Sequence, residues 1–203
     1  MGSQMFAIIL FLQPMPGVQD TLQACVEKGC VADSDEFMVL FGAGCSLRCA
    51  VDWIVTASSE LPPEDGNSYS ASNVDDIDST TAWVEGAEGW GIGESLTVSF
   101  IPWDNGQVAT STYGFTIQNG YARSPEVWEE NGRVHLLGIS LNGERFFVAE
   151  LADTWLPQTV QWDEWGSLRL SNGDFITLEI LSVYEGTLFE DTSISGLMFW
   201  GAH

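Results

Sequence analysis

Apolar and polar residues alternate with a period of two in many short stretches of this chain. In residues 96–100, for example, Leu96, Val98 and Phe100 alternate with a threonine and a serine. Such alternation is typical of a strand with one buried face, and no helical period separates these stretches. The pattern predicts strands at residues 49–57, 96–100, 111–118, 134–141, 145–151, 168–170, 175–183 and 194–200.

Two of the predicted connections carry residues that favour tight hairpins. Asn142-Gly143 separates residues 134–141 from residues 145–151. Asn-Gly is preferred in the type I′ turn, whose twist matches the twist of the flanking strands. Ser171-Asn172-Gly173 joins the next pair of strands in the same way. Roughly eight or nine strands at this spacing predict an all-β domain, an antiparallel jelly-roll β-sandwich.

Residues 72–100 combine features that an ordinary core strand does not need. A polar turn rich in carboxylates leads into Trp83, and glycines then stand at alternate positions, Gly89, Gly91 and Gly93. If residues 89–93 are extended, the three glycines share one face of the strand. A strand face without side chains lets a ligand or another backbone approach closely. We therefore expect the functional region of the chain near this stretch.

Length and apolar patterning divide the chain into three predicted parts. With 203 residues and 45% hydrophobic content, it fits one globular domain, residues 50–203, preceded by a short cysteine-bearing segment, residues 20–49. Residues 6–12 are an apolar run too short to span a bilayer but of the size of a signal-peptide core. We expect residues 1–19 to direct export, so that the protein is secreted or on the cell surface. The missing basic start and A-x-A site leave a buried first strand or a disordered terminus as the alternative.

All four cysteines lie in residues 20–50, as Cys25, Cys30, Cys45 and Cys49. An even number of cysteines after an export signal favours two disulfides in an oxidising compartment. Structural zinc and free thiols are the alternatives, although no histidine lies nearby and the spacing fits zinc sites poorly. Three pairings are open for four cysteines, and the sequence does not choose among them.

The charge of the chain excludes two classes of partner. Lys and Arg number 6 against 29 Asp and Glu, which gives a net charge of −23. Nucleic acids and anionic membrane surfaces both require clustered cationic side chains, so we expect neither partner. The acidic side chains are expected to form a solvated surface. The alternative is that some of them hold a divalent cation such as calcium.

No pattern of catalytic residues stands out. The two histidines are His135, inside a predicted strand, and His203 at the end of the chain. We interpret His135 as a structural or surface residue, since no G-x-S-x-G, H-E-x-x-H or Walker A sequence is present. Glycoside hydrolysis needs two placed carboxylates, and nothing singles out a pair. We therefore predict that the chain is not an enzyme.

Residues 73–83, NVDDIDSTTAW, resemble the N-x-x-D-G-D-x-x-T-x-W sequence of discoidin-like, galactose-binding-like domains. The rest of the chain is most similar to one branch, the NADase-type glycan-binding domain. This resemblance implies a jelly-roll module that binds glycans, and it does not imply NAD hydrolysis. The motifs that carry it, in order from about residue 50 to the end, are Thr81-Ala-Trp83-Val-Glu85-Gly86, Gly91-Ile-Gly93-Glu94, Asn119-Gly-Tyr121, Asn131-Gly-Arg133-Val134 and Asp191-Thr-Ser-Ile-Ser195-Gly196.

The resemblance also bears on a metal. Related modules often share one structural calcium between the early acidic turn and a late glutamate. Here Ile77 stands in place of a glycine and Gly196 in place of that glutamate, which removes one carboxylate ligand. The oxygen ligands that the resemblance implies for one structural calcium are Asn73, Asp76, Asp78 and Thr81.

Aromatic side chains in predicted loops are candidates for sugar binding. Pyranose rings stack their C–H faces on such side chains, and Asp, Asn and Arg bond the hydroxyls. Arg123 and Arg133 stand out among so few cations, and a buried pairing with carboxylates is the alternative to ligand binding. We predict a non-enzymatic extracellular carbohydrate-binding module, with a structural or protein-interaction module as the alternative. The candidate ligand-binding residues are Trp90, Trp103, Tyr121, Arg123 and Trp128.

Overall fold

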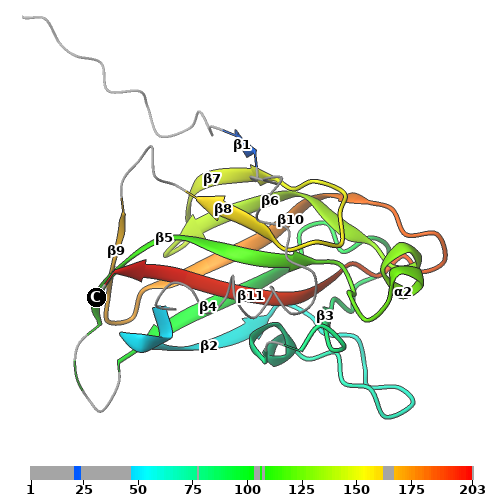
Figure 1. Cartoon of the computed structure of the whole chain (residues 1–203), viewed down its shortest axis with the longest axis horizontal. Coiled ribbons are helices and arrows are strands. Elements are labelled where there is room, and N and C mark those ends of the chain that lie inside the picture. The colour runs from blue at the N-terminus through cyan, green and yellow to red at the C-terminus, as the bar shows by residue number, and fades with distance from the viewer. Residues whose placement is uncertain are drawn as a thin grey trace, which may run out of the picture.

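Two β-sheets packed face to face form a sandwich in the computed structural model, which describes residues 21–23 and 47–202 except 77, 103–105, 107 and 162–166 (Figure 1). The short helical segments are η1 (Leu47–Cys49), η2 (Ala71–Asp75) and α2 (Pro125–Glu130). The strands are β1 (Thr21–Gln23), β2 (Asp52–Ala57), β3 (Trp83–Val84), β4 (Ser95–Ile101), β5 (Ala109–Asn119), β6 (Arg133–Leu141), β7 (Glu144–Glu150), β8 (Gln158–Gln161), β9 (Leu168–Ser171), β10 (Phe175–Tyr184) and β11 (Ser193–Ala202).

The strand order confirms the predicted all-β sandwich. One sheet has the order β1-β7-β6-β10-β4-β2, and the other has the order β3-β11-β5-β8 with β9 beside β5. Every pairing between these strands is antiparallel except that of β1 with β7, which is parallel. Consecutive strands β6 and β7 form the predicted hairpin. The second predicted hairpin is wrong, because β9 pairs with β5 in one sheet while β10 pairs with β4 and β6 in the other.

The core lies between the sheets and is built by the alternation seen in the sequence. In β4, Leu96, Val98 and Phe100 are buried while the residues between them are partly exposed. Phe199 of β11 contacts Phe100 edge to face across the sandwich, with ring centroids 5.6 Å apart. It also contacts Trp53 and Phe115, so one aromatic cluster joins both sheets. Burial of these large side chains supplies the main driving force for folding.

The hairpin turn at Asn142-Gly143 has the expected geometry. Asn142 has φ of 51° and Gly143 has φ of 84°, as a type I′ turn requires. The Asn142 side chain also accepts a hydrogen bond from the Phe175 amide at 3.1 Å. This contact fixes the turn against the start of β10.

The expectation of an extended strand at residues 89–93 is wrong. Gly89, Gly91 and Gly93 have φ of 83°, 64° and 96°, so this segment turns back on itself and β4 begins only at Ser95. Glycines at alternate positions are compatible both with a strand face without side chains and with a loop of positive φ. In this protein they form the loop. A close approach does occur at Gly91, but it is made by the Glu85 side chain, whose carboxyl carbon would lie 2.4 Å from a Cβ at this position.

The short helix α2 lies between the strands predicted at residues 111–118 and 134–141. Ser124 caps it by accepting a hydrogen bond from the Val127 amide at 3.3 Å, and Pro125 begins the helix. Ser-Pro-Glu is typical of the start of a helix, but the helix was not predicted because the prediction rested on the alternation of the strands. The short strands β3 and β8 were also not predicted, since two and four residues carry too little alternation.

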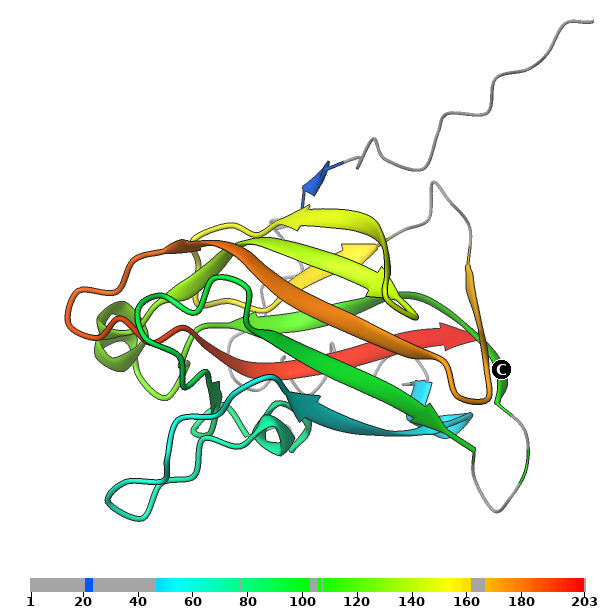
Figure 2. The ribbon, with the colours of Figure 1, turned by 180° about the vertical axis from the view of Figure 1, so that it is seen from behind.

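The connections gather at two ends of the sandwich. The loop after β2, the helix α2 and the β10–β11 connection lie at one end, and the turn between β9 and β10 lies at the other (Figures 1 and 2). Trp103 belongs to the β4–β5 connection and lies outside the described residues. Within the part that the structure describes, no helix is long and apolar enough to cross a membrane.

The predictions for the first fifty residues stay predictions. All of residues 1–19 and most of residues 20–49 lie outside the described residues, and so do Cys25, Cys30 and Cys45. Cys49 is described, and it is exposed and forms no disulfide in this structure. The structure therefore gives no support for a disulfide at Cys49, while the pairing of the other three cysteines stays open.

Candidate functional site

An open hollow of about 510 Å³ lies where the loop after β2, the turn before β3 and the segment after β5 meet. We call this cavity the hollow. Its size falls within the range of small-molecule sites, ~300–1,000 Å³. It brings together four of the residues selected from the sequence, one arginine among them, and no carboxylate. The lining residues are Gly66, Asn67, Ser68, Asn73, Thr80, Thr81, Tyr121 and Arg123.

Asn73 holds two walls of the hollow together. Its side-chain amide donates to the Ser68 carbonyl at 2.7 Å and to the Ala82 carbonyl at 2.9 Å. It lies in η2, which is capped by Ser70. Asn73 was predicted as a metal ligand, and in the structure its amide nitrogen joins the loop after β2 to the residue before β3.

A tight turn at residues 64–67 presents the outer rim of the hollow. Asp65 and Gly66 have φ of 49° and 84°, and Glu64 and Asn67 bond each other on either side of them. Asp-Gly is a turn-forming pair in the sequence. Its place beside residues 121–123 could not be derived there, because that contact is between segments distant in sequence.

The acidic turn before Thr81 forms the wall next to Asn73. Asp76 accepts hydrogen bonds from the Asp78 amide at 2.8 Å and from the Thr81 hydroxyl at 2.8 Å. Asp78 accepts from the Thr80 amide and hydroxyl, and these bonds hold the pKa of Asp78 below its usual value. The carboxylates thus order the turn that places both threonines at the hollow.

The same turn fits calcium only in part. The Thr81 hydroxyl bonds the Asp76 carboxylate, but Asp78 meets these two residues only through its backbone amide and carbonyl. Calcium takes six to eight oxygen ligands, and the turn offers two carboxylates and one hydroxyl. Within the described residues, no three His, Cys, Asp or Glu side chains are grouped to hold a metal. Calcium at this turn stays a prediction.

Tyr121 forms the aromatic side of the hollow, and Tyr69 packs against it. Tyr121 lines the hollow and is largely buried, with 7% of its surface exposed. Its ring meets Tyr69 edge to face, with centroids 6.4 Å apart. Burial, and then the neighbouring Tyr121 and Glu64, raise the pKa of Tyr69, so it stays a neutral hydroxyl at physiological pH. Tyr121 therefore offers an aromatic wall, and Tyr69 supports it from the side.

Arg123 is the charged group of the hollow. It is exposed, and its guanidinium donates a long hydrogen bond to the Asn67 side chain at 3.4 Å. The ion pairs of arginine in the described part of the chain belong to other residues: Arg48 with Asp52 and Asp75, Arg133 with Asp153, and Arg145 with Glu179. Arg123 is thus held by one weak contact at the edge of a cavity.

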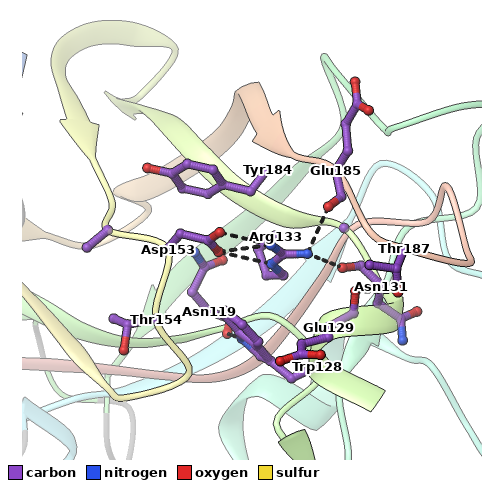
Figure 3. A network of polar contacts seen from close by, with 12 residues as sticks. Asn119, Trp128, Glu129, Asn131, Arg133, Asp153, Thr154, Tyr184, Glu185 and Thr187 are labelled. Carbon is purple, nitrogen blue, oxygen red and sulfur yellow. Dashed lines mark hydrogen bonds and ion pairs between the residues drawn. The ribbon is translucent and has the colours of Figure 1, made fainter. Parts of the chain in front are cut away.

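Trp128 and Trp90 do not line the hollow. The Trp128 indole donates to the Asn119 carbonyl at 2.9 Å, and the Arg133 guanidinium lies 4.6 Å from its ring centroid (Figure 3). Trp90 is half-buried, and its carbonyl accepts from the Thr192 hydroxyl. The sequence showed both as loop aromatics, but it could not show the arginine that covers Trp128.

Arg133 joins several segments at the end of the sandwich that carries the hollow. It is 7% exposed and forms a bidentate pair with Asp153, with N–O distances of 3.0 Å. It also donates to the Asn131 and Glu185 carbonyls, each at 3.0 Å (Figure 3). These contacts confirm the buried-pair interpretation for Arg133 and tie α2 to the connections after β7 and β10.

His135 lies on β6, where neighbouring strands surround it. Its Nδ1 is 3.1 Å from the Ser182 hydroxyl and its Nε2 is 3.4 Å from a Glu150 oxygen. The Tyr184 ring lies 4.7 Å away, centroid to centroid. These contacts join β6, β7 and β10 side by side, and His135 is not among the lining residues of the hollow.

Glu85 joins two of the sequence motifs. It is completely buried just after β3, and its carboxylate accepts from the Ala87 amide at 2.8 Å and the Thr192 amide at 3.1 Å. Burial raises the pKa of Glu85, and the two hydrogen bonds oppose that rise. Glu85 thus fixes the end of β3 to the residues that lead into β11.

The burial of Glu85 predicts a pH dependence of stability. Its pKa is higher in the folded than in the unfolded protein, so its contribution to stability is full at low pH and is lost as the pH rises through the folded pKa. We expect the melting temperature to fall less in Glu85→Gln than in the wild type between about pH 4 and about pH 7. Circular dichroism melts measure this slope.

The control for this experiment is Glu88→Gln, which changes an exposed glutamate in the same loop. It should keep the wild-type slope. Part of the slope should also remain in Glu85→Gln, since burial raises the pKa of Asp75 and Asp191 as well. Equal slopes in Glu85→Gln and the wild type would contradict the assignment.

Comparison with known proteins agrees with this fold. The sequence matches the family described as NAD glycohydrolase translocation F5/8 type C domain over residues 48–200. No curated protein gives a significant match. The structure is similar to CBM32-3 from a family 31 glycoside hydrolase of Clostridium perfringens, with a TM-score of 0.50, 16% identity, and coverage of 75% of this chain and 92% of that one.

A second similar structure is part of a much longer protein. The arabinofuranosyltransferase AftD from Mycobacteria matches with a TM-score of 0.50 and 15% identity over 75% of this chain, which spans 12% of the length of AftD. At such identities the likeness shows the β-sandwich fold alone. The family match is broader evidence, because it runs from η1 into β11 and includes every motif that carries the predicted resemblance. The chain therefore belongs to the NAD glycohydrolase translocation F5/8 type C domain family, a discoidin-like family.

Proposed function

We propose that the protein is a non-enzymatic carbohydrate-binding module and that the hollow is its binding site. The observation that carries the proposal is the meeting of Tyr121 and Arg123 with five polar side chains in one open cavity. The five are Asn67, Ser68, Asn73, Thr80 and Thr81. Ligand sites commonly combine an apolar wall with a few convergent polar groups.

The chemistry of the lining suits a sugar. Hydroxyls of a pyranose both donate and accept hydrogen bonds, and threonine, serine and asparagine side chains do the same. Tyr121 offers an aromatic wall for the apolar face of the ring, and Tyr69 packs against it. The lining contains no carboxylate pair for acid–base hydrolysis, so binding without turnover is the activity that we propose.

Export fits this proposal. A glycan-binding module acts outside the cell, so we propose that the protein is secreted or on the cell surface. The net charge of −23 also disfavours nucleic acid as a partner.

Filling the hollow should abolish sugar binding. Ser68 is exposed at the hollow, and its side chain makes no contact that the fold needs in the described structure, since only its carbonyl bonds Asn73. Ser68→Trp places an indole in the cavity, and we expect the affinity for any bound glycan to fall at least about tenfold. A glycan array followed by NMR titration of the bound sugars measures the change.

The matched control is Ser167→Trp, the same substitution at another exposed serine, just before β9. It should bind as the wild type does, and both variants should melt as the wild type does. Glycan binding that survives in Ser68→Trp would place the site elsewhere. A wild-type protein that binds no glycan on the array would refute the proposal.

A protein-interaction module is the second candidate, and one observation favours it. Leu188 and Phe189 are 65% and 45% exposed on the β10–β11 connection, although both amides are bonded to the Glu130 carbonyl. Exposed apolar residues on an anchored loop suit contact with a protein surface. Loss of a partner's binding in Leu188→Ser, with sugars having no effect on it, would support this candidate over the first.

A further inference from the structure

The charge of the hollow differs from that of the rest of the chain. Of 203 residues, 29 are acidic and 6 are basic, yet the eight lining residues include one arginine and no acid. Asp76 and Asp78, in the turn that leads to Thr81, accept hydrogen bonds within that turn. Asp65, next to Gly66 in the chain, is exposed and does not line the hollow. The hollow is therefore a place where the strongly acidic surface is interrupted.

Arg123 has the capacity to bind an anion there. Three other arginines form ion pairs with carboxylates of the protein, namely Arg48, Arg133 and Arg145. Arg123 instead contacts the neutral side-chain oxygen of Asn67 at 3.4 Å. A guanidinium presents a planar fork that matches the two oxygens of a carboxylate. A charge-assisted bidentate pair is roughly twice as strong as a neutral hydrogen bond, so a carboxylate would displace the Asn67 contact.

We infer that the saccharide bound in the hollow carries a carboxylate, as hexuronic and sialic acids do, and that Arg123 binds this group. The inference rests on the proposed function. The hydroxyls of Thr80 and Thr81 and the amide of Asn67 then bond the sugar hydroxyls. A carboxylate on the sugar pairs the one cation that the hollow exposes, and a neutral sugar leaves it unpaired.

The surrounding negative charge does not prevent this binding. Charges farther away than about 8 Å are largely screened at physiological ionic strength. Glu64 and Asp65 are close enough to help raise the pKa of Tyr69, but neither lines the hollow. Among the residues that line the hollow, the guanidinium of Arg123 is the charged group that an anionic sugar meets.

The test compares acidic sugars with their neutral parents on the full chain. The probes for NMR titration are methyl galactopyranosiduronate against methyl galactopyranoside, the methyl glycoside of sialic acid, and acetate. We expect at least one acidic sugar to bind about tenfold or more tightly than the galactoside, and acetate to bind more weakly than either. The two acidic probes distinguish a hexuronic from a sialic ligand.

Variants of Arg123 link this preference to the guanidinium. Arg123→Gln should remove the preference while weak binding of the galactoside persists, and Arg123→Lys should keep only part of it, because an ammonium lacks the fork. Arg169→Gln, at an exposed arginine on β9, is the control and should keep the full preference. Melting curves should be alike for all three.

Three outcomes would overturn the inference. Equal affinity for acidic and neutral sugars would refute it and leave the carbohydrate-binding proposal standing. If acetate binds as tightly as the acidic sugars, the hollow binds anions without recognising the sugar ring. Failure of every sugar to bind would refute the inference together with the proposed function.

Discussion

Replacing Arg133 with alanine should lower the free energy of unfolding by about 3 kcal/mol, among the largest effects of any single change in the protein. The guanidinium is 7% exposed and donates to Asp153 and to the carbonyls of Asn131 and Glu185. Alanine leaves those two carbonyls without their donor and removes the cation beside Trp128. Each buried polar group that loses its partner costs about 1–3 kcal/mol, so the losses accumulate.

Urea unfolding measures this change. The slope of the free energy of unfolding against urea concentration should be the same in the variant and the wild type, because both expose the same surface on unfolding. Arg133→Lys should recover little, since an ammonium cannot reach Asp153 and two carbonyls with one planar fork. Arg169→Ala, at an exposed position, is the control and should change stability by about 0.5 kcal/mol or less. A loss below about 1 kcal/mol for Arg133→Ala would show that the network contributes little.

The second large effect is expected at Gly91, where alanine should cost about 3 kcal/mol or more. Its φ of 64° disfavours any side chain, and a Cβ would lie 2.4 Å from the Glu85 carboxyl carbon. Glu85 is buried and bonded to the Ala87 and Thr192 amides, so its displacement also breaks these contacts. Strain and lost hydrogen bonds therefore add at this position.

Gly89→Ala separates the two causes. Gly89 has φ of 83°, but a Cβ there meets nothing within 4 Å, so only the backbone strain of about 1–2 kcal/mol applies. Thermal and urea unfolding of both variants give the difference directly. Equal losses at Gly89 and Gly91 would mean that Glu85 moves aside without cost, and the packing argument would fail.

The strands that the sequence predicted correctly are those whose evidence is local. Leu96, Val98 and Phe100 show their buried face by alternation, and Asn142-Gly143 encodes its own turn. β3 and β8 are too short to show a pattern, because their extended form depends on pairing with β11 and β5. The glycines at 89–93 misled for a different reason, since the same spacing serves a strand face and a left-handed loop.

The candidate site was predictable to a similar degree. Tyr121 and Arg123 were selected from the sequence as an aromatic and a rare cation, and the hollow includes both. Asn67 and Ser68 were missed because nothing local indicates that their loop lies beside residue 121. Trp128 was selected as an aromatic side chain in a predicted loop, but its position depends on Arg133, five residues away in sequence and on another element.

The two hydrogen bonds of Asn73 have a consequence for the thermodynamics of recognition. They join the loop after β2 to the start of β3, so the hollow has its shape before any ligand arrives. Ordering a flexible loop at the moment of binding would cost conformational entropy, about 0.5–1.5 kcal/mol for each side chain immobilised. Here that ordering is completed during folding. Small saccharides, which offer few contacts, gain most from such a preformed site.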